Sequence, residues 1–233
     1  MSAADKPVMY ERMIAAIKSN LVPVILEAFR LLPDSIVLGT GLLSIVSLCK
    51  SYGVLLLTMF ELMIAQRIIA NMVGSIRSIG AGPNILNNIC QPGFVFPNTM
   101  RLSILEQIGI PSSFPSPVLF FLTGVVSYMI SSVREFSREM KSLGGDLQVR
   151  TVVGVILSSF LVFIIFGLRL TYGCESFGTL LLSIIFGIMF GIAIMYQNKV
   201  LFGRDGLNIL NIPMILTAAE SGKPMYVCAP SGM

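Results

Sequence analysis

The sequence predicts an all-α integral membrane protein with about four transmembrane helices, an amphipathic N-terminal helix and an extended C-terminal tail. Hydrophobic residues make up 55% of the chain and charged residues only 12%, about half the charged share of an ordinary soluble domain. A run of about 18 or more apolar residues is long enough to cross the hydrocarbon core, because about 20 helical residues span about 30 Å. Four runs fit this description: Ser35–Phe60, Pro117–Val133, Thr151–Leu168 and Thr179–Gln197.

The first unit, residues 1–34, contains an amphipathic pattern from Met9 to Leu32. At 100° per residue its apolar side chains fall on one arc and its charged side chains occupy the rest of the circle. Such a helix lies in the headgroup plane with basic residues facing anionic lipid. Packing of the same face against a protein neighbour is the equal alternative.

The second unit, residues 35–198, holds the predicted four-span bundle. Its first apolar segment, from Ser35 to Ala70, exceeds the thickness of a bilayer, so we expect one crossing that emerges near Glu61–Arg67. The alternative is a hairpin that turns at Lys50–Gly53. We disfavour the hairpin because its two arms would be too short to cross fully.

Charge in the connecting segments predicts the orientation of the bundle. Four crossings place residues 1–34, the loop 134–150 and the tail 199–233 on one side, and the long loop 71–116 on the other. Loops that face the cytosol carry excess Lys and Arg. Both termini are therefore expected on the cytosolic side, with 71–116 exoplasmic, since the first side carries these basic residues: Lys6, Arg12, Lys18, Arg30, Arg134, Arg138, Lys141, Arg150, Lys199, Arg204 and Lys223.

Three charged residues fall in or beside the predicted spans: Lys50, Glu61 and Arg169. Lys50 and Glu61 are eleven residues apart, close to three turns, so both point the same way at a separation of roughly 16 Å. They can belong to a polar pathway for an ion or proton. They can equally make structural contacts with neighbouring helices, which we favour because a pathway needs more polar groups within the membrane.

Small residues recur at four-residue spacing in the last two spans, as Gly154 and Ser158 and as Ser183, Gly187 and Gly191. This spacing lets helix backbones approach closely, which is how membrane helices gain packing energy. We expect spans three and four to form a hairpin packed along these faces. Homo-oligomerisation through the same faces is the alternative.

Two of the four cysteines, Cys90 and Cys174, fall in the predicted exoplasmic loops. In an oxidising compartment a disulfide between them would tie the long loop to the turn at 170–178. Free thiols are the other outcome, and sequence alone does not fix the pairing.

The sequence offers little catalytic chemistry. It contains no His, which removes the commonest general acid, base and metal ligand. No C-x-x-C, Walker or G-x-S-x-G motif occurs. We therefore expect no enzyme activity, no cofactor and no metal. A net charge of +4 gives no argument for nucleic acid as a partner.

Three sequence segments carry a resemblance: Lys50–Gly53 followed by Glu61, Tyr172–Glu175, and Gly203–Pro213. Together they resemble multi-span membrane proteins of large icosahedral double-stranded-DNA viruses of algae and protists. The resemblance lies in spacing along most of the chain and includes no active-site motif. It implies a virion protein embedded in the internal bilayer beneath the capsid shell, in a membrane derived from the host.

The leading functional hypothesis is a structural virion membrane protein, a minor capsid component that anchors the capsid or another coat protein to the bilayer. The tail 199–233 would be the docking segment, with Arg204, Asn208, Asn211 and Pro213 as its contact residues. The alternative is a small channel, transporter or accessory subunit of a membrane complex that uses Lys50, Glu61 and Arg169.

Overall fold

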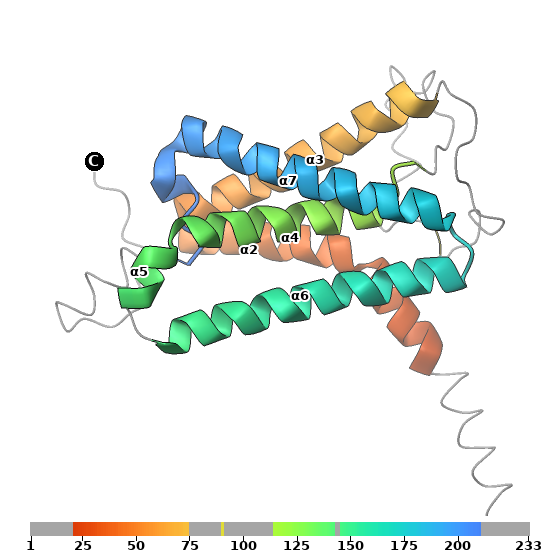
Figure 1. Cartoon of the computed structure of the whole chain (residues 1–233), viewed down its shortest axis with the longest axis horizontal. Helices are drawn as coiled ribbons and strands as arrows, with labels where there is room; N and C mark the ends of the chain where they lie inside the picture. The colour runs from red at the N-terminus through yellow and green to blue at the C-terminus, as the bar shows by residue number, and fades with distance from the viewer. Residues whose placement is uncertain (1–20, 75–89, 91–113, 143–144, 211–233) are drawn as a thin grey trace, which may run out of the picture.

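Helices account for nearly all of the residues that the structure, a computed structural model, describes: 21–74, 90, 114–142 and 145–210. Residues 21–30 are helical, and no strand occurs in these ranges. The all-α fold class is therefore confirmed. The helices that follow in order (Figure 1) are α2 (Leu32–Ser47), α3 (Lys50–Gly74), α4 (Pro117–Glu135), α5 (Ser137–Ser142), α6 (Gly145–Thr171) and α7 (Phe177–Gly206).

Four of these helices are long and apolar enough to span a membrane, over Lys50–Ala70, Pro117–Glu135, Gln148–Thr171 and Phe177–Gly206. The last three correspond to the three predicted spans that follow the long loop. Each is somewhat longer than its apolar run, because the helix continues into the polar residues at the ends. The chain is thus an all-α membrane protein.

The first apolar run differs from the expected single crossing. It breaks at Leu48–Cys49 into α2 and α3, which lie antiparallel: a Cβ on Gly53 would approach Ser44, and one on Gly41 would approach Leu56. The turn lies just before the Lys50–Gly53 segment of the alternative hairpin. The arms are also unequal, since α2 has 16 residues but α3 has 25 and is long enough to cross.

The break has a local cause at Leu48. Its backbone lies in the left-handed region (φ 50°, ψ 23°), which ends an α-helix and costs a non-glycine residue about 1–2 kcal/mol. Ser47 offsets part of this cost. Its hydroxyl donates a hydrogen bond to the Leu43 carbonyl and accepts one from the Cys49 amide at 3.4 Å. The following polar residues, Lys50 and Ser51, then begin α3.

The added reversal changes which segments share an end of the bundle. The end marked by Cys90, Cys174 and Arg169 is called the disulfide end here, and the end marked by Glu135, Lys199 and Arg204 the Glu135 end. Leu26, Phe29 and Arg30 lie beside Arg169 and Cys174, where they help line a cavity of about 30 Å³. The segment before α2 therefore lies at the disulfide end, away from residues 134–142 and not beside them as expected.

Helix α4 forms the centre of the bundle, and α7, α3 and α6 pack around it. In Figure 1, α4 lies between α7 and α6. Phe120, Phe121 and Tyr128 of α4 are completely buried. Helix α6 is peripheral, and its outer apolar side chains, such as Phe163 (76% exposed), are available to lipid.

The C-terminal tail begins later than expected. Residues 199–206 continue α7 and are not extended chain, although Gly203 (φ 74°) kinks the helix. The helix persists because Lys199 and Arg204 form ion pairs with Glu135 and Glu139 of the neighbouring segment. Residues 211–233, like residues 1–20 and most of the loop 71–116, lie outside the described residues.

A glycine substitution tests the break at residue 48. Leu48→Gly is expected to stabilise the protein by about 1 kcal/mol, because glycine adopts positive φ without the steric cost that leucine incurs. Leu38→Gly, at a similarly exposed position inside α2, should instead cost about 1 kcal/mol. Reversible unfolding in mixed detergent and SDS gives both free energies. Equal losses in the two variants would mean that the helix runs on through residue 48.

Candidate functional site

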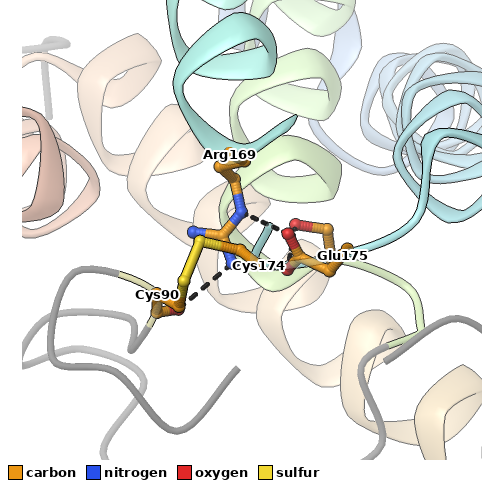
Figure 2. Close-up of a disulfide and its surroundings, with 5 residues drawn as sticks. Cys90, Arg169, Cys174 and Glu175 are labelled. Atoms are coloured by element: carbon orange, nitrogen blue, oxygen red, sulfur yellow. Dashed lines mark hydrogen bonds and ion pairs between the residues drawn. A yellow bond between two sulfur atoms is a disulfide. The ribbon is translucent and has the colours of Figure 1, made fainter. Parts of the chain in front are cut away.

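The disulfide end is closed by a covalent link and a buried ion pair (Figure 2). Cys90 and Cys174 form a disulfide with a Cα–Cα distance of 5.2 Å, so of the two outcomes left open by the sequence the structure contains the bridge. Beside it, the Arg169 Nε donates to Glu175 Oε2 at 2.8 Å, and its Nη2 bonds to Glu175 Oε1. The same Nη2 donates to the Cys90 carbonyl at 3.1 Å.

The Arg169–Glu175 pair is almost excluded from solvent. Arg169 is 8% exposed and Glu175 is 3% exposed. Burial of two charges is costly and is offset only where both groups are fully hydrogen-bonded. Here the guanidinium donates to both Glu175 oxygens and to the Cys90 carbonyl, and the carboxylate also accepts from the Ser116 hydroxyl at 3.0 Å. Arg169 is thus a structural residue that is already neutralised by its partner.

Ser116 extends this network into the helix bundle. It precedes α4, which starts with Pro117 at a position where a missing amide proton costs nothing. Its backbone amide donates to Ser183 Oγ of α7 at 2.7 Å. The preceding carbonyl, that of Pro115, accepts from Gln66 Nε2 of α3 at 3.1 Å. The start of α4 is therefore bonded to α3, α7 and the α6–α7 turn at once.

Ion pairs also hold the Glu135 end. Lys199 Nζ lies 2.8 Å from Glu135 Oε1. The Arg204 guanidinium lies 2.6 Å from Glu139 Oε1, donates to the Glu135 carbonyl at 2.7 Å and stacks 4.9 Å above the Phe136 ring. A backbone hydrogen bond, together with Arg204, lowers the pKa of Glu139 and keeps this carboxylate charged. These contacts join the end of α7 to α4 and α5.

Between the two ends, α4 and α7 approach at backbone distance. A Cβ on Gly187 would lie 2.6 Å from the Phe120 carbonyl oxygen, and one on Gly191 would overlap the Gly124 carbonyl. Ser127 Oγ lies 3.0 Å from the Gly124 carbonyl oxygen and 3.3 Å from that of Ile188 on α7. We call this contact, formed by Phe120–Ser127 and Ser183–Gly191, the α4–α7 seam.

The small-residue face of α7 was expected to pack against the third span, α6, and this prediction is wrong. Ser183, Gly187 and Gly191 pack against α4 and not against α6. Nothing lies within 4 Å of a Cβ built on Gly154, and the Ser158 hydroxyl bonds back to the Gly154 carbonyl at 2.7 Å. Small residues permit close approach but do not specify a partner, and here α4 supplies the complementary surface.

A polar cluster lies within the bundle beyond the seam, where α3, α4 and α7 meet. Asn198 Nδ2 donates to Thr58 Oγ1 at 2.8 Å, and Gln197 Nε2 donates to Glu61 Oε1 at 3.2 Å. The Tyr128 hydroxyl faces Thr58 and Asn198, and it also faces Ser132, its neighbour one turn along α4. Thr58, Tyr128, Ser132 and Asn198 are buried, and Glu61 is partly buried.

The three predicted intramembrane charges thus occupy three separate environments. Lys50 is exposed at the first turn of α3 and donates to the Phe202 carbonyl at 3.0 Å. Arg169 pairs with Glu175 at the opposite end. Glu61 alone belongs to the intramembrane polar cluster. The break at Leu48 explains the difference, since it moves Lys50 from the interior of a span to a helix end.

Of the four predicted docking residues of the tail, two lie in the described part of the chain and two lie outside it. Arg204 is bonded to the segment 135–139, and Asn208 is only 7% exposed. Both make contacts within this chain. Asn211 and Pro213 lie outside the described residues.

Comparison with protein-family models, with curated proteins and with solved structures finds no match. The candidate site therefore rests on geometry.

Sequence reasoning missed several residues that the site uses. Glu175 follows Arg169 by six residues across a tight turn, a spacing that indicates a pair once the turn is recognised. Tyr128 and Asn198 stand beside other polar residues, Ser127 and Gln197, and such polar groups at membrane depth are a signal because they need partners.

The buried ion pair yields a prediction for stability. Glu175→Gln leaves the Arg169 charge uncompensated, so unfolding free energy should fall by about 3–5 kcal/mol. Glu27→Gln, which removes an exposed pair with Arg30, should cost no more than about 1 kcal/mol. Unfolding in mixed detergent and SDS measures both. If the two losses were equal, the disulfide-end ion pair would contribute no more than a surface pair.

The seam yields a second stability prediction. Gly191→Ala should destabilise the protein by about 1–3 kcal/mol, because the added methyl forces the α4 and α7 backbones apart. The control Gly154→Ala introduces the same methyl into open space and should be neutral or slightly stabilising. The same unfolding assay compares them. A larger loss at Gly154 than at Gly191 would place the helix interface on α6.

Proposed function

We propose that this chain is a structural membrane protein that anchors a protein layer to the bilayer. The observation that carries the proposal is the closure of the α4–α7 pair at both ends. At one end Ser116, at the start of α4, bonds to Ser183 and to Glu175, whereas the contacts of Glu135 with Lys199 and Arg204 hold the other end. A membrane anchor needs this rigidity.

The same contacts argue against a transporter of the rocking type. Alternating access requires one group of helices to move against another around a central site. Here movement of α7 against α4 would break the hydrogen bonds of Ser116 to Ser183 and Glu175 and separate the Gly191 backbone from that of Gly124. The chemistry of the bundle therefore favours holding a fixed shape over cycling between two shapes.

The proposed setting is the internal membrane of a virion, with a capsid or other coat protein as the layer that is anchored. This part of the proposal rests on the resemblance of Lys50–Gly53, Tyr172–Glu175 and Gly203–Pro213 to membrane proteins of large icosahedral double-stranded-DNA viruses. The tight internal bonding of Arg204 and the burial of Asn208 shift the proposed docking contacts to the chain after residue 210.

We propose that the Glu135 end faces the cytosol. Within the described ranges, Arg30, Arg67 and Arg169 lie toward the disulfide end, and a larger set of basic residues lies toward the other: Lys50, Arg134, Arg138, Lys141, Arg150, Lys199 and Arg204. The positive-inside rule then assigns the second end to the cytosol. Cysteine oxidation gives no further orientation, because Cys49 at the Glu135 end is disulfide-bonded as well.

The segment that precedes α2 is then proposed to lie on the exoplasmic side. Leu21, Val24 and Ile25 are exposed there, as an interfacial helix with its apolar face toward lipid requires. The loop 134–150 keeps its proposed cytosolic side, because the extra reversal at Leu48 precedes it and shifts only the segment before α2.

A second candidate function is a small channel or an accessory subunit of a membrane complex. The polar cluster around Glu61 favours it, because intramembrane carboxylates often mark ion or proton pathways. Ion flux in proteoliposomes separates the two functions. Flux that disappears in Glu61→Gln would support the channel, whereas an anchor produces none.

Cross-linking mass spectrometry on intact native particles or membranes tests the anchor. We expect Lys223, in the segment after residue 210, and Lys141, at the Glu135 end, to link to a coat protein that has no membrane span. Links from the same lysines only to other multi-span subunits would contradict the anchor and support membership of a membrane complex.

A further inference from the structure

Several buried oxygen atoms of the polar cluster have no hydrogen-bond partner. They are Glu61 Oε2, Tyr128 Oη, Ser132 Oγ and Asn198 Oδ1. The side chains of Tyr128, Ser132 and Asn198 belong to fully buried residues, each with 0% exposure. Buried polar atoms are almost always paired in folded proteins, so a group of four that converge on one place from three helices points to a missing ligand.

The cluster also carries an uncompensated charge. Glu61 forms no ion pair with any described residue, and the groups that face it are neutral: Gln197 and Asn198 from α7, with Tyr128 of α4 nearby. Lys50 is about 16 Å away along α3 and bonds to the Phe202 carbonyl. Lys199, the residue after Asn198, points to Glu135. A carboxylate at this depth in the membrane therefore lacks a counter-charge.

We propose that this cluster binds one alkali cation of the size of sodium. The ligands are Glu61 Oε2, Asn198 Oδ1, Tyr128 Oη and Ser132 Oγ, with Thr58 Oγ1 completing the set. Hard cations take carboxylate, carbonyl and hydroxyl oxygens in place of their hydration shell. The single carboxylate neutralises one positive charge, so a divalent ion would leave an excess charge inside the bilayer.

The number of oxygens distinguishes a cation from a proton. A proton on Glu61 Oε2 turns that oxygen into a donor to one neighbour, and the Tyr128 and Ser132 hydroxyls contribute only their own hydrogens, whereas one cation contacts every oxygen of the set. The arrangement also provides entry. Gln197 is exposed and Glu61 is partly buried, whereas Tyr128 and Asn198 lie beneath them. The ion therefore enters between α3 and α7, past the Gln197 amide. This inference does not depend on the anchoring function.

Thermal unfolding of the purified full-length protein in lipid nanodiscs tests the site. Sodium chloride is titrated against choline chloride at constant ionic strength, and the midpoint temperature is recorded. A ligand that binds the folded state at 100 times its Kd should raise that temperature by about 5–10 °C. The rise should saturate with sodium and should be absent with choline. Equal effects of the two salts would overturn the proposal.

Carbodiimide labelling of Glu61 separates sodium from a proton. This reagent attacks a protonated carboxyl group, so bound sodium should protect Glu61 from modification at constant pH. Peptide mass spectrometry quantifies the modified fraction with sodium or with choline. Labelling that changes with pH but not with sodium would identify a proton site and would overturn the proposal.

Substitutions that remove or replace one proposed ligand oxygen at a time test the ligand set. Tyr128→Phe keeps the buried ring but removes one ligand, and it should weaken sodium binding about tenfold or more. Ser159→Ala is the matched control, because its exposed hydroxyl bonds only to the Val155 carbonyl of its own helix; its sodium affinity should be unchanged. Glu61→Gln should abolish the sodium-dependent rise. Unchanged affinity in both Tyr128→Phe and Glu61→Gln would place any sodium site elsewhere.

Discussion

The contact on which the rest of the structure depends is the backbone approach of α4 and α7 at Gly187 and Gly191. Lipid is as apolar as the helix surfaces, so burying leucine against leucine gives no advantage within a membrane. Close packing of backbones and hydrogen bonds between helices must supply the stability. At the α4–α7 seam both occur together, because the missing side chains of two glycines bring Ser127 within 3.3 Å of the Ile188 carbonyl. Helix α3 then packs on this pair, and α6 remains largely exposed to lipid.

Different interactions hold the two ends of the α4–α7 pair together. At the disulfide end, burial makes the Arg169–Glu175 pair sensitive to the loss of either partner, and the disulfide closes a separation of 84 residues, which restricts the unfolded chain. At the Glu135 end the charges are partly exposed, so each contact contributes little alone. Their effect comes from the number of elements they connect, since Arg204 contacts both α4 and α5. A bundle held in this way resists relative helix motion.

The sequence predicted α4, α6 and α7 because long apolar runs report membrane depth directly. It gave a turn at Lys50–Gly53 only as the disfavoured alternative and did not predict the break at Leu48, since a left-handed leucine between two apolar segments leaves no mark on hydropathy. That single residue explains why Lys50 lies at a helix end and why the segment before α2 changes sides. The four-residue spacing identified the small-residue face of α7. It did not identify α4 as the partner, because the spacing describes the surface of one helix and packing also depends on the surface of the other. Arg169 was recognised as polar, and its role became clear only when the turn brought Glu175 to it.

The polar cluster depends on the same seam that makes the bundle rigid. Asn198 follows Gly191 by seven residues, two helical turns, so it lies on the face of α7 that meets α4. Tyr128 and Ser132 continue the corresponding face of α4 beyond Gly124. The close contact therefore fixes the separation of the oxygens that α4 and α7 contribute, while α3 adds Glu61 and Thr58. Selective binding of a small cation requires oxygens held at set positions, and a loosely packed bundle could not hold them. Rigidity in this protein thus suits the retention of an ion, and a bound ion would in turn neutralise Glu61, which already joins α3 to α7 through its hydrogen bond from Gln197.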